Sequence, residues 1–343
     1  RFDGPAAALA ALPDIAAQAG KTAEIPEPAA IEAELAAGAK LGARLLCLGA
    51  ADYPAALAEL PDPPPALWAR GDAALAGPQT VAVVGARNAS AAGRRMAALL
   101  AEGLGAAGWV IVSGLARGVD RAAHEAALAA GTVAVTAGGL DKPYPPENAA
   151  LSDAIAAEGL LLSEAPLGEA PTARHFPKRN RIVSGLSAGV VLIEAAERSG
   201  SLITARFAAE QGREAMAVPG SPLDPRAAGC NALIRDGAAL VRSAEDVIEA
   251  LGSPRTRALR RATPGLWTGQ AAPASAPAPK QPPEAAGPAE RVAALLGPTP
   301  ISFDALCRAA DLAPAELSAA LLELDLDGRI DRRAGDLIAL APA

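Results

Sequence analysis

The sequence predicts an α/β protein built on a mostly parallel, doubly wound sheet, with one small domain before it and another after it. Between residues 61 and 252, short runs of Val, Ile and Leu alternate with helical stretches, which is typical of βαβ units. On both sides of this region the pattern changes to Ala- and Leu-rich helical periodicity. A stretch rich in Pro and Ala separates the last domain from the sheet.

Residues 1–60 predict short helices interrupted by Pro and Gly. The stretch 9–20, broken by Pro13, predicts a small helical hairpin, and Ala29–Leu41 predicts a further helix that ends at a capping glycine. This is the layout of a small SAM or helix-hairpin-helix-like domain. Such modules can grip the DNA backbone, but the basic loop needed for that is missing here, so we favour a packing or protein-contact role. The proline-rich turn at 61–65 marks the boundary of the next domain.

Residues 61–252 carry the strands and helices of the predicted sheet. The predicted strands are Val81–Val84, Val110–Val112, Val133–Thr136, Leu160–Ser163, Val190–Ile193 and Ala215–Val218. The predicted helices between them are Ala91–Ala107, Arg121–Ala130, Pro146–Ala157 and Ala205–Gln211. In sheets of this kind, ligands bind outside the carboxyl ends of the strands, so the residues that follow each strand are the first candidates for a site.

Residues 253–288 are too rich in Pro, Ala and Gln to bury an apolar core, and we interpret them as a linker. Trp267 is an exception within this linker and is a weak candidate for a docking anchor.

Residues 289–343 predict three helices, Ala289–Leu296, Phe303–Ala310 and Pro314–Asp325, followed by a hairpin that turns near 334–335. Three helices and a hairpin make a winged-helix-like domain, whose third helix normally lies in the DNA major groove. Acidic residues without any Lys or Arg occupy and follow this helix here: Glu316, Glu323, Asp325 and Asp327. We therefore favour contact with protein over contact with duplex DNA, although Arg329, Arg332 and Arg333 near the hairpin keep the second interpretation open.

Composition indicates an intracellular protein without a structural metal or disulfide framework. The three cysteines (Cys47, Cys230 and Cys307) are far apart and form no cluster with the two histidines. No apolar run reaches the length of roughly 18 to 20 residues that spans a bilayer, and the first residues make a poor secretory signal. We predict a cytoplasmic protein that needs no cofactor and no metal ion.

Charge is distributed unevenly along the chain. The net charge of −7 comes from 31 Lys and Arg against 38 Asp and Glu, which disfavours indiscriminate binding to nucleic acid. Between residues 174 and 213, however, seven basic residues face three acidic ones. Because salt screens charges beyond about 8 to 10 Å, a local basic patch can still hold phosphates at contact distance.

The stretch His175–Thr204 combines this basic patch with a buried-strand run and a small polar turn. Its cationic cluster is Lys178, Arg179, Asn180 and Arg181, and its turn is Ser199-Gly200-Ser201. Guanidinium and amide groups beside a turn rich in hydroxyls and glycine indicate a site for phosphates.

Three other strand ends offer glycine or serine on the same predicted edge of the sheet. They are Gly85-Ala86-Arg87, Ser113-Gly114 and Gly138-Gly139. The first precedes a helix N-terminus, a common place for an anion, although neither a dinucleotide fingerprint nor a P-loop lysine is present. Arg87 supplies a donor fork that fits phosphate, with pairing to a nearby carboxylate as the alternative.

Other polar and aromatic residues near these strand ends have plainer interpretations. Asp120 is expected to cap a helix and His124 to pack within it. Tyr144 stands in a proline-rich frame and can either stack on a base or fill the loop. No Ser-His-Asp set, activated cysteine or carboxylate pair at hydrolase spacing is present, so the residues predict a binding cleft rather than a catalytic centre.

Four segments of the chain resemble the DNA-processing protein A family (DprA, also called Smf). They are SGLARGVDRAAHEAAL, HFPKRNRIVSGLS, EAAERSGSLITARFAAEQGRE and AVPGSPLDPRAAGCNALIRDGA. The resemblance covers about residues 60–250 and implies a Rossmann-like domain that binds single-stranded DNA. It also implies a role in natural transformation, protection of incoming strands, loading of RecA, and homodimerisation through the Rossmann domain.

The resemblance carries over sixteen strand-binding positions onto this sequence. They are Gly85, Ala86, Arg87, Ser113, Gly114, Gly138, Gly139, Phe176, Lys178, Arg179, Asn180, Arg181, Ser199, Gly200, Ser201 and Thr204. Phe176 is expected to act as an aromatic platform for a base, with a core plug beneath the loop as the alternative. Ala86 departs from the serine of many family members and removes one hydroxyl donor.

Two other functions remain open. A nucleotide-cleaving phosphoribohydrolase of the related Rossmann group would carry PGGxGTxxE after the strand at Val190–Ile193, and this motif is absent. A small-nucleotide sensor that signals to the winged domain would bind mononucleotides tightly and oligonucleotides weakly.

Overall fold

The computed structural model describes residues 4–341 except for 21, 24, 78, 253–286, 298–299 and 334–336. Within these residues, nine strands form one sheet in the order β1-β2-β6-β5-β4-β3-β7-β8-β9. The strands are β1 Ala43–Cys47, β2 Ala66–Gly71, β3 Thr80–Gly85, β4 Val110–Ser113, β5 Thr132–Thr136, β6 Leu160–Ser163, β7 Gly189–Ile193, β8 Glu214–Ala217 and β9 Ala239–Leu240. From β6 to β9 all neighbours run parallel, whereas β1 and β2 are antiparallel additions at one edge.

The chain winds from β3 outward in both directions, which confirms the doubly wound α/β class. Strand β4 pairs with one side of β3, and β7 pairs with the other from Ala82 opposite Val190 to Gly85 opposite Ile193. The point where the strand order reverses therefore lies between β3 and β7. In open α/β sheets this is where a crevice forms at the carboxyl ends of the strands.

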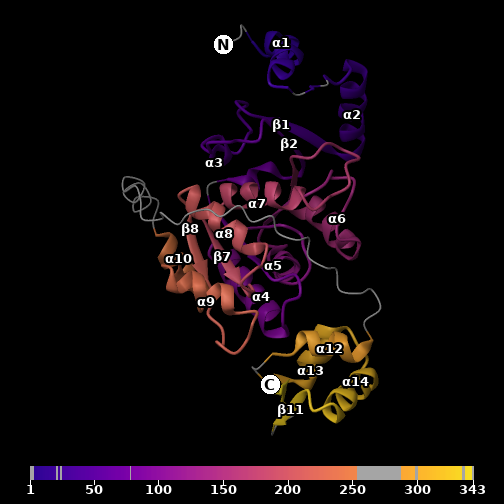
Figure 1. The fold of residues 1–343 in the computed structure, drawn as a ribbon, viewed down its shortest axis with the longest axis vertical. Helices are drawn as coiled ribbons and strands as arrows, with labels where there is room; N and C mark the ends of the chain where they lie inside the picture. Colours follow the sequence, from indigo (N-terminus) through magenta and orange to yellow (C-terminus); the bar gives the residue numbers. More distant parts are fainter. Residues whose placement is uncertain are drawn as a thin grey trace.

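Helices cover both faces of the sheet (Figure 1). Their bounds are α3 Ala55–Ala58, α4 Ala91–Ala106, α5 Val119–Ala127, α6 Ala149–Glu158, α7 His175–Leu186, α8 Ser201–Glu210, α9 Ala228–Arg235 and α10 Ala244–Leu251, with short 3-10 helices at Ala73–Ala76 and Pro146–Asn148. Alternate residues of a strand point to opposite faces, so Val81 and Val83 pack with α4, α5 and α10, while Ala82 and Val84 pack with α3, α7 and α9. Burial of both faces explains why the strands are continuously apolar.

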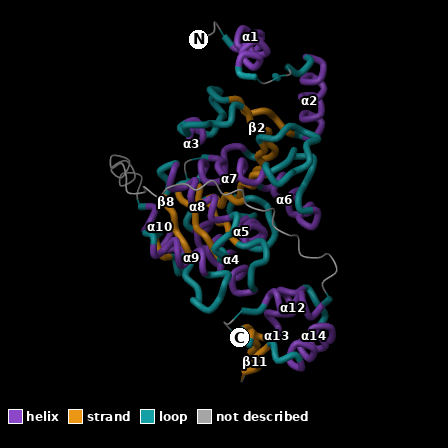
Figure 2. The backbone as a smooth tube through the Cα atoms, viewed as in Figure 1, coloured by secondary structure: helices purple, strands orange, loops and turns teal. Residues whose placement is uncertain are grey.

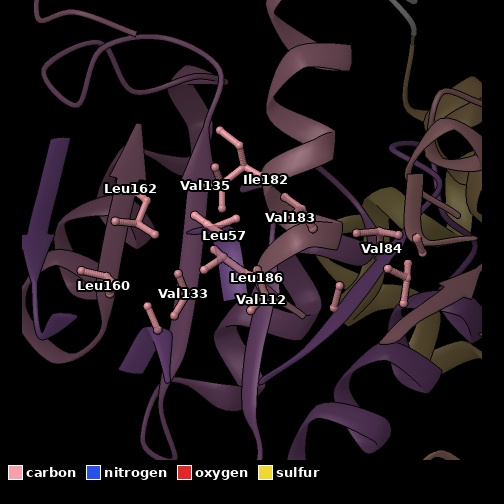
Figure 3. Close-up of a cluster of buried hydrophobic side chains, with 14 of the residues drawn as sticks. Leu57, Val84, Val112, Val133, Val135, Leu160, Leu162, Ile182, Val183 and Leu186 are labelled. Atoms are coloured by element: carbon pink, nitrogen blue, oxygen red, sulfur yellow. The ribbon is translucent and has the colours of Figure 1, made fainter. Parts of the chain in front are cut away.

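The larger core cluster joins residues far apart in the sequence (Figure 3). Ile182 and Leu186 of α7 lie against Val112 and Val133 of the sheet, and Leu57 of α3 packs in the same cluster. Burial of a Leu or Ile side chain stabilises the fold by about 1.5 to 3 kcal/mol relative to its exposure. The apolar side of α7 thus anchors the helix on the sheet and leaves its other side for the rim.

The N-terminal region differs in two respects from the sequence prediction. Helix α1 (Pro5–Gln18) continues through Pro13 instead of breaking there. Helix α2 (Pro28–Leu41) ends at Gly42 as predicted, and the φ of 73° suits a glycine cap. Strand β1 and Leu57 belong to the sheet and its core, although the predicted helical domain extended to residue 60. Strand β1 has two successive exposed residues, Arg44 and Leu45, instead of a regular alternation, and it follows a long helical pattern, so the sequence did not reveal it.

The C-terminal residues adopt the winged-helix fold, as the sequence predicts. Helices α12 Pro288–Leu295, α13 Phe303–Ala310 and α14 Pro314–Leu326 pack on a three-stranded sheet of β10 Ile301–Ser302, β12 Leu337–Leu340 and β11 Ile330–Arg333. The predicted linker, Trp267 included, and the predicted hairpin turn lie outside the described residues, apart from 287–288 at the end of the linker. No helix in the described part of the chain has the length and apolar character needed to cross a membrane.

Two arginines of the sheet unit hold the winged unit. Arg94 donates from Nη1 to the carbonyl oxygen of Ala309 at 2.9 Å, near the end of α13. Arg226 donates to the carbonyl oxygens of Ala294 at 3.2 Å and Leu296 at 2.8 Å, at the end of α12. Cations at the negative ends of two helices make a favourable contact. The winged unit and the N-terminal helices lie at opposite ends of the molecule (Figure 2).

Candidate nucleic-acid interface

The carboxyl ends of β3 and β7 bring the first predicted segment against the turn before α8. A Cβ atom on Gly85 would collide with the carbonyl oxygen of Ile193, so glycine is required for the close approach of the two strands. The backbone of Ala86 completes the junction by donating to the Ile193 carbonyl at 3.3 Å. Arg87 follows and is exposed at this rim.

The cationic cluster lies on helix α7. The alternative interpretation of Phe176, a core plug beneath a loop, had assumed that this segment is a loop. Successive residues of a helix point about 100° apart, so neighbouring cations face different surroundings. Lys178 is exposed, Arg179 is buried with 6% of its surface accessible, and Arg181 is half-buried. The cluster therefore consists of side chains with separate roles.

Arg179 points into the protein and pairs with Asp120. Its Nη1 lies 4.0 Å from Oδ2 of Asp120, which also accepts hydrogen bonds from the N–H groups of Gly114 at 3.1 Å and Ala116 at 3.3 Å. A Cβ atom on Gly114 would collide with the Arg179 guanidinium. Gly114 is thus a space for Arg179 rather than an opening for a ligand, and Asp120 does more than cap its helix.

Burial sets the protonation of the groups around this pair. Desolvation lowers the pKa of Arg179 to about 10, although the nearby Asp120 carboxylate opposes the shift, and desolvation raises the pKa of Asp120. His124 is fully buried, and desolvation lowers its pKa to about 3. Its Nε2 accepts from the N–H of Leu115 at 3.3 Å and its Nδ1 lies 2.7 Å from Oγ1 of Thr132, so it is neutral with the proton on Nδ1. This agrees with the expected packing role.

Arg181 is engaged with protein groups on its exposed side. It pairs with the carboxylate of Glu164 and donates to the carbonyl oxygen of Asp62 at 3.0 Å. These partners lie before β2 and after β6, so Arg181 ties α7 to the antiparallel edge of the sheet. Its guanidinium is less available to a phosphate than the ammonium group of Lys178.

Phe176 forms the centre of an aromatic and cationic group at the start of α7. The guanidinium carbon of Arg87 lies 4.5 Å from the centroid of the Phe176 ring, and the Tyr144 ring lies 5.8 Å away at 59°. Phe176 is half-buried and Tyr144 is 40% exposed, so neither is a core side chain. Guanidinium and aromatic planes of this kind can stack on nucleic-acid bases.

The small polar turn lies beside α7. Nδ2 of Asn180 lies 3.4 Å from the carbonyl oxygen of Gly200, and the hydroxyls of Ser199 and Ser201 are 2.7 Å apart. Gly200 is exposed at the N-terminus of α8. Thr204 is one turn further and buried, so its side chain lies beneath this surface.

Three other predicted positions are covered. The hydroxyl of Ser113 is fully buried and donates to the carbonyl oxygen of Val83 at 2.6 Å. The N–H of Gly139 donates to the carbonyl oxygen of Glu169 at 2.9 Å, and a Cβ on Gly138 would come within 2.8 Å of that oxygen. The loop after β6 therefore lies over the Gly138-Gly139 pair, and the exposed rim is shorter than the sequence predicted.

A carboxylate that the sequence analysis did not select lies at the N-terminus of α4. Oε2 of Glu194 accepts from the N–H of Ser90 at 2.8 Å, and Oε1 accepts from the Ser90 hydroxyl. The φ of Glu194 is 50°, an uncommon conformation for a residue other than glycine. Only the pairing of β3 with β7 brings these residues together, so no local sequence signal indicated the contact.

Among the described residues, no group of three His, Cys, Asp or Glu side chains is arranged to hold a metal ion.

Comparison with protein families finds three adjoining matches. The family model of DNA recombination-mediator protein A matches residues 44–252, the DprA winged helix domain matches 276–336, and a DprA-like N-terminal HHH domain matches 1–37. The last match ends before β1, in keeping with the place of β1 in the sheet.

Several curated proteins are similar to the chain. DNA processing protein DprA of Bacillus subtilis is 46% identical over 220 residues, which cover 63% of this chain and 74% of the relative. Protein Smf of a Synechocystis strain is 36% identical over 307 residues, 83% of this chain and 77% of the relative.

Two solved structures share the fold. The X-ray structure of DprA from Streptococcus pneumoniae superposes with a TM-score of 0.61 at 43% identity, covering 65% of this chain and 77% of that one. DprA from Helicobacter pylori, whose structure gives insights into its single-stranded DNA binding mode, has a TM-score of 0.56 at 33% identity, with coverage of 61% and 95%.

Proposed function

Since this chain belongs to the DNA recombination-mediator protein A family, we propose that it binds single-stranded DNA along the rim between β3, α7 and α8. The observation that carries the proposal is the exposed Arg87, whose guanidinium lies over the half-buried Phe176 at the start of α7, the helix that also carries the exposed Lys178. Single strands are held by cations that follow the phosphates and by aromatic platforms, each worth about 1 to 3 kcal/mol per stacked base. The turn at Ser199–Ser201 adds hydroxyl and backbone donors beside the cations.

The sixteen positions divide into three proposed roles. We propose that Arg87, Phe176, Lys178, Asn180 and Gly200 contact the strand, with Gly85, Ala86, Ser199 and Ser201 shaping the rim. The buried or engaged positions, among them Arg179 and Arg181, hold α7 and the strand ends in place. Contacts to phosphate set the register of a strand without reading its sequence, so binding should be insensitive to sequence.

We further propose that the bound strand is passed to RecA during natural transformation, and that the chain forms a homodimer through its sheet unit. The similarity to curated DNA processing proteins supports this assignment. If this chain loads RecA, its addition should shorten the lag before RecA hydrolyses ATP on protected single-stranded DNA. Sedimentation velocity of the full chain tests the dimer.

The decisive experiment for strand binding is a titration with three probes over a salt series. The probes are an unstructured oligonucleotide, the matching duplex and mononucleotides. We expect the single strand to bind more tightly than the duplex, with a salt slope of about −0.7 per neutralised phosphate. Equal affinity for the mononucleotide and the oligonucleotide would overturn the proposal in favour of a nucleotide sensor.

A further inference from the structure

The N-terminus of α4 is occupied by a side chain of the same protein. The Glu194 carboxylate accepts two hydrogen bonds from Ser90, one from its N–H at 2.8 Å and one from its hydroxyl. The same hydroxyl accepts from the N–H of Gly93 at 2.9 Å, so it also caps the helix. These contacts join the end of β7 to the turn after β3, across 104 positions of sequence.

This turn is the position at which nucleotide-binding α/β proteins hold a phosphate. It is the first βα turn of the parallel sheet, it lies at the switch point, and it leads into a helix of 16 residues whose N-terminus favours an anion. A Cβ on Gly93 would lie 2.5 Å from Cδ of Glu194. Glycine at this position makes room for the glutamate.

Space for a ligand exists next to the carboxylate. A cavity of about 280 Å³ is lined by Ser90, Gly93, Glu194 and Pro219 of the sheet unit and by Leu295 and Ile301 of the winged unit. A diphosphate group entering it would meet a negative charge at the one place where the helix offers its N–H groups. Two negative charges at such a short distance repel each other, so the carboxylate opposes the entry of the diphosphate.

We propose that Glu194 is a specificity-determining residue that keeps nucleoside phosphates and pyrophosphate out of the first βα turn. Its carboxylate takes the place of the phosphate, so the exposed cations Arg87 and Lys178 remain for the anionic ligand of the rim. A mononucleotide, whose affinity depends on one phosphate site, loses that site. A polymer with several phosphates along the rim does not depend on it.

The test replaces Glu194 and measures binding of inorganic pyrophosphate and ADP to the full chain by titration calorimetry. Glu194→Gly removes the carboxylate and suits the positive φ of the position. We expect it to bind pyrophosphate about tenfold more tightly than the wild-type chain, as expected for an anion at a helix N-terminus. Glu194→Gln keeps the side-chain length without the charge, and its affinity should fall between the two.

Glu197→Gly is the matched control, because Glu197 is an exposed acid in the same loop. It should leave pyrophosphate affinity at the wild-type value. A folded Glu194→Gly chain that binds pyrophosphate no more tightly than the wild-type chain would overturn the proposal. If circular dichroism shows that the glycine variant is unfolded, Glu194→Gln decides by the same criterion. The inference does not depend on strand binding, because the pyrophosphate measurements contain no DNA.

Discussion

Replacing Lys178 by alanine removes an exposed cation of the proposed rim. Lys178 is exposed on α7, and within the described residues it forms no ion pair. Arg181, one turn further on, pairs with Glu164 and bonds to Asp62. The two positions carry the same charge on the same helix, so they compare an exposed, unpaired cation with one that is engaged by protein groups.

The expected effect follows from counterion release. Loss of one phosphate contact reduces the slope of log affinity against log salt by about 0.7 for a single strand. Between about 50 and 200 mM salt, the advantage of the wild-type chain over Lys178→Ala should therefore shrink about 2.6-fold. Arg181→Ala should leave the slope unchanged and lower the free energy of unfolding by about 1.5 to 3 kcal/mol, because it removes hydrogen bonds to a charged partner.

Fluorescence anisotropy with a labelled, unstructured oligonucleotide at several salt concentrations measures both slopes, and urea denaturation measures stability. Lys40→Ala is the control for a lost surface charge, since Lys40 is exposed on α2, away from the rim. An unchanged slope for Lys178→Ala, or a reduced slope for Arg181→Ala, would refute the assignment of the two roles.

Three further predictions concern the interior and the winged unit. Arg179→Met leaves Asp120 buried without its counter-charge and should cost about 3 to 5 kcal/mol of unfolding free energy in urea; a cost below about 1 kcal/mol would contradict this role. Burial lowers the pKa of His124 from 6.5 to about 3, so the neutral ring stabilises the fold above pH 6.5. This stabilisation is lost as the pH falls from 6.5 toward 3, by up to about 1.4 kcal/mol for each pH unit. In His124→Gln the midpoint of urea denaturation should depend less on pH between about pH 6.5 and 5. An unchanged pH dependence of the midpoint would exclude a neutral, buried imidazole. Replacing Arg94 and Arg226 together by alanine should raise the radius of gyration in solution scattering, because both cap helices of the winged unit; an unchanged radius would mean that other contacts hold it.

The strands and the winged unit were predictable because their signals are local. Runs such as Val81–Val84 and Val190–Ile193 are apolar on both faces, as strands covered by helices must be. Strand β1 escaped prediction because its five residues lack a regular alternation, with Arg44 and Leu45 both exposed, and follow a long helical segment. Its place in the sheet depends on antiparallel pairing with β2, a partner about 20 residues away whose choice no local pattern reveals.

The sequence predicted at which edge of the sheet the candidate residues lie, but not which of them are exposed. The glycines and cations do gather at the carboxyl ends of the strands, since connectivity alone sends those ends to one edge. Which of them face solvent was decided by packing. The helical phase of α7 turns Arg179 inward to Asp120, and the loop after β6 covers Gly138 and Gly139.

The sequence by itself determined the class of fold, the helical and winged units and the edge of the sheet at which the candidate residues gather, because hydrophobic periodicity, capping and turn residues act over short distances. Only the tertiary structure decided which charges remain free, because burial and ion pairing depend on residues brought together from distant parts of the chain. Glu194 is the clearest case: it meets Ser90 only because β3 and β7 pair, and its charge then occupies the helix N-terminus that the sequence had assigned to a phosphate.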